Sequence, residues 1–371
     1  MNSQKKPITV CFIAPKAYPL FNPSVEEVFG GAEVDLYYLA TELAQDSDYR
    51  VSFIVADYGQ QKVEQRGGVK VIKSLDFKQN SLTGAVKIWR ALNKADADIY
   101  MIKTVSPGMF LLAFYCRCKS RHFIYRTAHC DECDGTYLSR YHFAGKLYKW
   151  ALKKADVVFT QNDTDRNNLK KTTGIDAVTV PNGHRLEPLQ EVKRDIILWV
   201  ARSAEFKRPE LFIKLAKQFP QAKFVMICQR ATGDKNYERL VKQAEGIDNL
   251  EFIQRVPFAE IDNYFRRAKV FVNTSEAEGF PNTFIQACKA GTAIVSLNVN
   301  PDGFLDKYKC GICCDDNFDR LVSSLKSVVQ NQSFVEMGKN ARKYVEQTHN
   351  VADIVRQYKT IINTLTNKKH K

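Results

Sequence analysis

The residues best suited to chemistry follow a short β-branched and aromatic run at 270–273, where Glu278-Gly279-Phe280-Pro281 turns the chain. Pro281 suits the first position of a helix and Gly291 its C-terminal cap, so the predicted order is strand, carboxylate, glycine turn, helix and second strand. The first N–H groups of such a helix favour an anion. Because like charges repel, Glu278 is expected to accept hydrogen bonds from neutral hydroxyls beside that anion. This combination describes a site for a nucleotide sugar.

Two cations follow a second buried run, which begins at Ile196 and is predicted to be a strand. Arg202 and Lys207 would flank one pocket at the end of this strand, and Pro209 would begin the next helix. Two cations beside a diphosphate offset its charge and stabilise it as a leaving group. The alternative is a pair of ordinary surface charges.

The rest of the chain supplies the elements that must position these residues. A strand at 8–14 and a loop at 15–29 precede Gly30-Gly31-Ala32-Glu33, which opens an amphipathic helix. Further strand-like runs stand at 51–56, 69–72, 99–103, 122–125 and 157–160 in the N-terminal half, and at 223–228, 250–253 and 269–273 in the C-terminal half. This alternation predicts parallel sheets with helices on both faces, whose ligands lie beyond the carboxyl ends of the strands. Gly30 and Gly31 lack the G-x-G-x-x-G spacing of a dinucleotide fingerprint, and a tight turn with no other role remains the alternative for them.

The glutamate turn resembles the motif of the retaining glycosyltransferases of family 4, also called glycosyl transferases group 1, which have the GT-B fold. Their pattern has two glutamates separated by seven residues, in a setting such as S-x-x-E-G-F-P-N-x-x-x-E. Here Glu278 is the first, and Gln286 stands where the second belongs. The resemblance implies that Glu278 contacts the donor sugar and Gln286 the ribose, by an amide hydrogen bond that lacks charge assistance.

The resemblance also implies roles for residues elsewhere in the chain. His129 follows the strand at 122–125, and family members often carry a histidine there, near the anomeric carbon of the donor sugar. We therefore predict Glu278 and His129 to be catalytic, although His129 could equally be a loop histidine without a role. The predicted donor-binding residues are Gly30, Gly31, Arg202, Lys207, Gly279, Phe280, Pro281, Asn282, Thr283 and Gln286.

The implied fold is α/β of the GT-B type, with two Rossmann-like domains facing each other across a cleft and a C-terminal helix returning to the first. A length of 371 residues suits two domains. Residues 1–183 would bind the acceptor and 195–348 the nucleotide sugar, with a polar linker at 184–194 and the returning helix at 349–371. A helical pattern over 335–365 agrees with such a tail.

The implied reaction moves a sugar from a UDP- or GDP-linked donor to a saccharide or lipid-linked saccharide with retention, in the synthesis of cell-surface polysaccharide or glycoconjugate. No cofactor or metal is expected, because cations and helix amides would stabilise the departing diphosphate.

Two other classes of function remain open. A silent GT-B binding subunit would explain Gln286, and a GT-B nucleotide-sugar epimerase would need more acid–base groups than six histidines readily supply.

The ten cysteines are scattered, and without a secretory context reduced thiols are expected. Cys130-x-x-Cys133 and Cys310-x-x-Cys313-Cys314 have spacing typical of zinc ligands. A four-ligand site would require these distant pairs to meet, so the prediction is that no metal is bound.

The net charge of +14 favours anionic partners, and no nucleic-acid-binding motif is present. The segment between Pro107 and Lys154 contains nine cations and three acidic residues. It also contains an apolar run at 109–115, which is either a buried helix or part of a membrane contact. No run reaches transmembrane length, and no signal peptide is recognised. We expect a cytoplasmic protein. Two alternatives remain open: the protein binds peripherally to the anionic inner face of the membrane, or it does not bind the membrane and uses a soluble acceptor.

Overall fold

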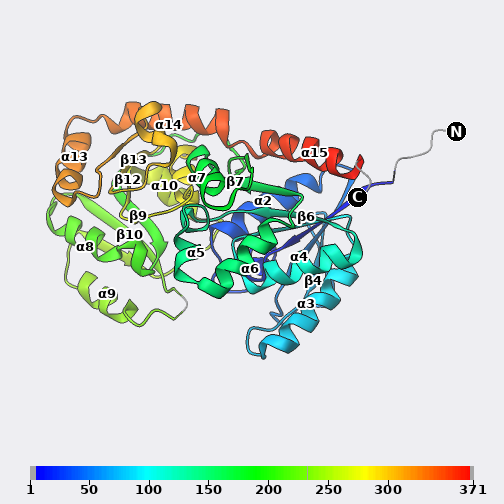
Figure 1. Cartoon of the computed structure of the whole chain (residues 1–371). Helices are drawn as coiled ribbons and strands as arrows, with labels where there is room; N and C mark the ends of the chain where they lie inside the picture. The colour runs from blue at the N-terminus through cyan, green and yellow to red at the C-terminus, as the bar shows by residue number, and fades with distance from the viewer. Residues whose placement is uncertain (1–5, 232, 368–371) are drawn as a thin grey trace. The chain divides into compact units, whose positions relative to one another are not determined.

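The computed structural model describes residues 6–231 and 233–367, which form two compact units (Figure 1). The first unit contains the described residues up to 185 and from 350 onward, and the second contains those from 186 to 349. Residues 185–195 contain no helix or strand. The boundaries expected from the sequence were 183 and 349, and the binding roles assigned to the two domains remain predictions.

The first unit is built on an eight-stranded sheet with the order β3-β4-β2-β1-β5-β6-β7-β8. Its parallel strands are β1 (Ile8–Ile13), β2 (Tyr49–Val55), β4 (Val69–Lys73), β5 (Ile99–Lys103), β6 (His122–Arg126), β7 (Val157–Thr160) and β8 (Val178–Thr179). The predicted parallel sheet is therefore confirmed. The edge strand β3 (Val63–Arg66) was not predicted, because its polar sequence V-E-Q-R forms an antiparallel hairpin with β4 rather than a buried strand.

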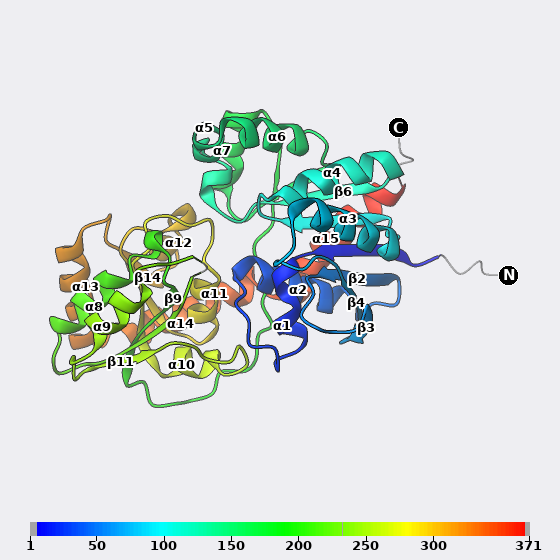
Figure 2. The same ribbon diagram turned by 90° about the horizontal axis from the view of Figure 1, so that it is seen from below.

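Helices cover this sheet on both faces (Figure 2). The helices of this unit, besides the short α1 (Tyr18–Phe21), are α2 (Gly31–Leu43), α3 (Ser81–Ala95), α4 (Pro107–Lys119), α5 (Thr136–Arg140), α6 (His142–Leu152), α7 (Asp163–Thr173) and α15 (Val351–Asn367). The apolar run at 109–115 lies in α4 and is mostly buried, as one of its two interpretations required, with Phe114 still 52% exposed. Helix α15 packs against α2, so the C-terminal segment belongs to the first unit.

The second unit has a six-stranded parallel sheet with the order β11-β10-β9-β12-β13-β14. The strands are β9 (Ile196–Arg202), β10 (Lys223–Gln229), β11 (Leu250–Ile253), β12 (Ala268–Asn273), β13 (Ala293–Ser296) and β14 (Gly311–Cys313). The helices are α8 (Pro209–Lys217), α9 (Tyr237–Ala244), α10 (Ile261–Arg267), α11 (Asn282–Lys289), α12 (Phe304–Lys307), α13 (Phe318–Gln330) and α14 (Phe334–Thr348). The strand order reverses between β9 and β12, and ligands of such sheets bind outside the strand ends at that point.

One segment differs from expectation. The loop at 15–29 contains a helical stretch, formed by a 3₁₀ turn at Pro15–Ala17 and α1 (Tyr18–Phe21), whose apolar side chains are buried. The helical pattern over 335–365 forms two helices, α14 and α15, and Asn350 accepts a hydrogen bond from the N–H of Ala352 at the start of the second. No helix among the described residues has the length and apolar character needed to cross a bilayer.

Candidate functional site

The predicted site residues fall into two groups, one in each unit. Glu278, Arg202, Lys207, residues 279–283 and Gln286 lie in the second unit, and Gly30, Gly31 and His129 lie in the first. Each group stands beyond the carboxyl ends of the strands of its sheet, as the sequence predicted for ligand-binding residues.

Glu278 lies in the loop after β12 and is held by three side chains. The ammonium of Lys207 is 2.6 Å from its Oε2, and the hydroxyl of Ser275 donates to Oε1 at 2.7 Å. The Asn273 amide donates to the same Oε1 at 3.4 Å. The carboxylate is thus fixed in place before any ligand arrives.

Although Glu278 lies in a loop, its carboxylate is not exposed to solvent. Its side chain is only 12% exposed, because Lys207 and the loop around Ser275 cover it. Burial alone would raise the pKa of this carboxyl, but the charge of Lys207 and the hydrogen bonds from Lys207 and Ser275 outweigh burial and lower it. Glu278 is therefore ionised at neutral pH.

The two predicted cations occupy different environments. Lys207 ends a 3₁₀ turn and pairs with Glu278, so its predicted contact with a diphosphate would compete with this ion pair. Arg202 ends β9 and is partly buried, and its guanidinium makes no hydrogen bond or ion pair with any residue that the structure describes. Arg202 is consequently the cation of this site that remains available for an anion.

Arg208 joins the two loops and was not singled out from the sequence. Its guanidinium donates to the carbonyls of Thr274 and Ser275 at 2.9 and 3.2 Å and pairs with Asp316 at 2.5 Å. Thr274 closes the same junction, since its hydroxyl donates to the carbonyl of Lys207 at 2.7 Å. These bonds hold the loop that carries Lys207 against the loop that carries Glu278. Only the K-R-P sequence before α8 signals Arg208.

The glycine turn and helix after Glu278 form as the sequence predicted, with one shift. Pro281 is the N-cap residue and α11 begins at Asn282, one residue later than expected, while Gly291 has the left-handed conformation of a C-terminal cap. Asn282 and Thr283 lie in the first turn and are partly exposed. Gln286, one turn further on, lines a small cavity together with Asp262, Arg266 and Lys289.

Phe280 is an anchor of the turn rather than an exposed contact. It is 7% exposed, and its ring lies 5.2 Å from that of Phe304 and 4.9 Å from that of His349. The neighbouring Gly279 is also buried. This packing fixes the turn, because moving it would expose the aromatic ring.

In the first unit, Gly30 is the N-cap of α2, and its N–H donates to Glu33 Oε2 at 2.8 Å. Gly31 begins the helix and is exposed. The predicted helix opening at Gly30-Gly31-Ala32-Glu33 is thereby confirmed as local structure, and its contact with a donor remains a prediction.

A buried ion cluster fixes α2 against the strands that precede the predicted site. Asp35 of α2 lies 2.8 Å from Lys103 at the end of β5 and 2.9 Å from Arg126 at the end of β6. Arg126 also donates to the Tyr358 hydroxyl of α15 and to Asn182, each at 2.7 Å. Burial lowers the pKa of Lys103 to about 8. Burial would raise the pKa of Asp35, but the charges of Arg126 and Lys103 outweigh it and lower that pKa. Arg126 is one of the nine cations between Pro107 and Lys154, but it is 0% exposed and therefore does not contribute to a basic surface.

A second buried carboxylate holds the loop that carries His129. Glu132 accepts from the hydroxyls of Tyr125 and Thr104 at 2.5 and 2.9 Å and from the N–H of Ala128 at 3.3 Å. Burial raises the pKa of this carboxyl. His129 caps the short turn, because its Nδ1 accepts from the N–H of Asp131 at 3.3 Å. The imidazole therefore carries its proton on Nε2 when neutral.

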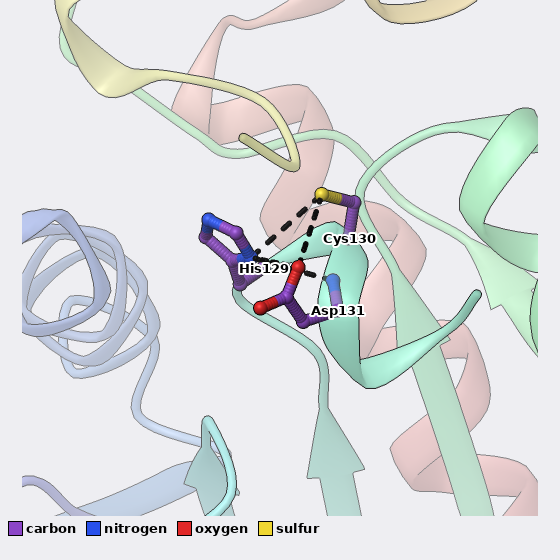
Figure 3. A group of neighbouring side chains, drawn as sticks. All are labelled: His129, Cys130 and Asp131. Atoms are coloured by element: carbon purple, nitrogen blue, oxygen red, sulfur yellow. Dashed lines mark hydrogen bonds and ion pairs between the residues drawn. The ribbon is translucent and has the colours of Figure 1, made fainter. Parts of the chain in front are cut away.

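Cys130 and Asp131 lie beside this histidine, and Figure 3 shows the three side chains turned toward one another. His129 Nδ1 is 3.7 Å from Cys130 Sγ and 3.3 Å from Asp131 Oδ1. Burial, then the charges of Asp165, Asp131 and Asp134, raise the pKa of the Cys130 thiol to about 12. Sequence spacing had paired Cys130 with Cys133, but Cys133 is fully buried, and the group of possible metal ligands in the described chain is His129, Cys130 and Asp131.

Two family profiles match consecutive parts of this chain. "Glycosyltransferase Family 4" matches residues 29–187, and "Glycosyl transferases group 1" matches residues 184–348. The Bacillus subtilis protein YtcC, whose name assigns it provisionally to the glycosyltransferases, is 24% identical over 192 residues. That match covers 48% of this chain and 47% of YtcC, so it spans about half the length of this curated relative.

Solved structures share the fold across nearly the whole chain. The sucrose-phosphate synthase of Thermosynechococcus elongatus has a TM-score of 0.80 at 16% identity, covering 97% of this chain and 99% of that protein. A variant of TarM from S. aureus, in complex with fondaparinux, α-GlcNAc-glycerol and UDP, has a TM-score of 0.77 at 11% identity, covering 96% and 100%. At these identities the likeness establishes the architecture of two α/β domains.

Proposed function

The chain belongs to the glycosyltransferases of family 4, glycosyl transferases group 1, with the GT-B fold, and we propose that it transfers a sugar from a nucleotide-diphosphate sugar with retention of anomeric configuration. The observation that carries the proposal is the ionised Glu278, fixed beside Lys207 and Ser275 where the second sheet reverses its strand order. A carboxylate at this place can hold sugar hydroxyls and stabilise positive charge that develops at the anomeric carbon.

The remaining residues receive roles that fit their positions. Arg202 and Lys207 offset the charge of the diphosphate as it departs, the first turn of α11 adds its N–H groups, and Gln286 binds the ribose. His129 donates a hydrogen bond from Nε2 to a sugar hydroxyl. The leaving diphosphate accepts the proton of the incoming hydroxyl, so the proposed reaction takes place without a metal ion. UDP is the first nucleotide to test, since the TarM relative was solved with UDP.

The proposal is tested by a thermal-shift screen of UDP-, GDP- and ADP-sugars, followed by NMR of the product. A donor that binds the native state raises the unfolding midpoint by mass action. With that donor, slow hydrolysis in the absence of acceptor should release the sugar first in its original anomeric form. Release of the inverted anomer would contradict retention. A shift without any turnover would support the silent binding subunit, and conversion to an epimeric nucleotide sugar would support the epimerase.

Removal of either cation should weaken nucleotide binding unequally. Arg202→Ala should lower nucleoside diphosphate affinity by about 1.5–3 kcal/mol, the scale of a hydrogen bond to a charged group. Lys207→Ala should cost less, because in the free protein Lys207 must first leave Glu278. Calorimetry on both variants measures the difference, and Lys193→Ala, an exposed lysine of residues 185–195, is the matched control. Unchanged affinity in both variants would exclude the pair from the site.

We also propose that the acceptor is lipid-linked and that the first unit binds an anionic membrane. Helices α3 to α6 contain no acidic residue. Phe143, in the first turn of the basic helix α6, is 77% exposed, and Tyr141, the N-cap residue of this helix, is 48% exposed. Basic residues near an anionic leaflet add about 1 kcal/mol each, and exposed aromatic rings suit the interface. The surface cations between residues 107 and 154 are Arg117, Lys119, Arg121, Arg140, Lys146, Lys149, Lys153 and Lys154.

Liposome flotation measures this contact. The protein should bind vesicles that contain anionic lipid and should not bind neutral vesicles. Binding should weaken as the salt concentration is raised, because salt screens the attraction beyond a Debye length. Combined charge reversal of Lys146, Lys149 and Lys153 to Glu should weaken binding and leave nucleotide affinity unchanged. The control reverses three exposed lysines of the second unit, Lys217, Lys242 and Lys326. Equal loss in both triple variants would show that net charge alone is responsible, and no binding at low salt would favour a soluble acceptor.

A further inference from the structure

We propose that His129, Cys130 and Asp131 form a binding site for a single transition-metal ion of the zinc type. The three residues are consecutive, and they present one imidazole nitrogen, one sulfur and one carboxylate oxygen within 4.8 Å of one another. These are the ligand types that zinc takes in proteins. The site differs from both cysteine pairs that have zinc-like spacing in the sequence.

The distances match those of one face of a tetrahedron around zinc. Typical zinc–ligand bonds place a nitrogen and a sulfur about 3.6 Å apart, a nitrogen and an oxygen about 3.4 Å apart, and a sulfur and an oxygen about 3.6 Å apart. Here Nδ1 to Sγ is 3.7 Å, Nδ1 to Oδ1 is 3.3 Å and Sγ to Oδ1 is 3.9 Å. The ligand atoms therefore stand near coordination distance of a common centre, with a fourth position left for water or another ligand.

The surroundings favour a cation and hold the ligands in place. Asp165 and Asp134 act on Cys130 electrostatically and add negative potential. The charge of Arg140 opposes a bound cation, but its side chain is 61% exposed and lies 4.0 Å from Oδ2 of Asp131, the oxygen that is not part of the group. The buried carboxylate of Glu132 fixes the turn that presents all three residues. Binding would exchange the hydrogen bond from the N–H of Asp131 to Nδ1 for a metal bond and would release the thiol proton to solvent.

Occupation of the site has a consequence that rests on the proposed function. If His129 contacts the donor sugar, an ion on its Nδ1 adds positive charge beside a centre that itself becomes positive in the transition state. The ion should therefore inhibit transfer, and the site would make the enzyme sensitive to zinc.

Cobalt(II) titration of the purified full chain tests the site without reference to activity. The wild type should bind one ion with the charge-transfer absorption of a cobalt–thiolate bond, and zinc should displace it. Cys130→Ser should abolish this absorption. Asp131→Asn should keep the thiolate absorption and weaken cobalt binding at least about tenfold. Loss of a direct ligand should cost no less than loss of a residue that only supports a ligand by a hydrogen bond. Cys118→Ser, which removes an exposed cysteine of the same unit, is the control and should behave as wild type.

The outcomes separate the site from the function. No thiolate absorption in the wild type, or absorption that survives Cys130→Ser, would overturn the site. Thiolate-bound metal without inhibition of sugar transfer would leave the site standing and overturn the placement of His129 beside the sugar. Metal binding in a protein that shows no transfer with any donor would confirm the site and count against the proposed function alone.

Discussion

Glu278→Ala is expected to lower the rate of sugar transfer by about 10²–10³-fold, the loss seen when one group that stabilises transition-state charge is removed. The carboxylate is pre-positioned by Lys207 and Ser275, so its removal takes away an interaction that needs no reorganisation during the reaction. Circular dichroism should show a folded variant, since the backbone of the turn is held independently by Arg208 and Phe280. Initial rates with the donor found by thermal shift give the measurement.

Glu276→Ala is the matched control, because Glu276 lies in the same loop and is exposed. It should transfer at close to the wild-type rate, and equal rates for Glu276→Ala and Glu278→Ala would contradict the catalytic role. Glu278→Gln adds a second test. It keeps an acceptor for Ser275 and releases Lys207 from its ion pair, so nucleoside diphosphate should bind as tightly as before or more tightly while turnover falls.

Asp35→Asn should destabilise the first unit by about 3–5 kcal/mol, the cost of leaving a buried charge without its partner. The substitution leaves both Lys103 and Arg126 in the interior, where each is less than about a twentieth exposed and where no other carboxylate is paired with them in the described chain. Urea unfolding monitored by circular dichroism measures the loss. The transition of the first unit should move to lower urea.

Asp46→Asn provides the comparison. Asp46 pairs with Lys359 of α15 at 2.6 Å, but both side chains are about one-third exposed. A solvent-exposed pair of this kind contributes about 0–1 kcal/mol. Equal destabilisation by the two substitutions would show that Asp35 does not act through buried charge. A larger loss of stability for Asp35→Asn than for Asp46→Asn is the expected result. It would show that the buried ion cluster between α2 and the strand that precedes His129 stabilises the first unit.

Local sequence signals alone predict the class of fold, most of the parallel strands of both units, and the turn that carries Glu278. These features rest on local signals: apolar runs of strand length, glycine and proline at helix ends, and a motif within one stretch of chain. The same local character explains the errors. The strand V-E-Q-R was missed because it lies at a polar edge, and the helical turn Tyr18–Phe21 was predicted as loop because a single turn has no apolar period.

The pairing of charged residues becomes visible only in the folded chain. Arg126 has the sequence appearance of a surface cation, yet it is paired with a carboxylate 91 positions earlier in the chain. Lys207 and Glu278 are likewise distant in sequence and in contact in space. Local pattern cannot reveal such pairs, since burial of a charge depends on a partner that another strand or helix supplies. The grouping of His129, Cys130 and Asp131 is a different case: the residues are adjacent, but the direction of their side chains follows from the turn that buried Glu132 holds.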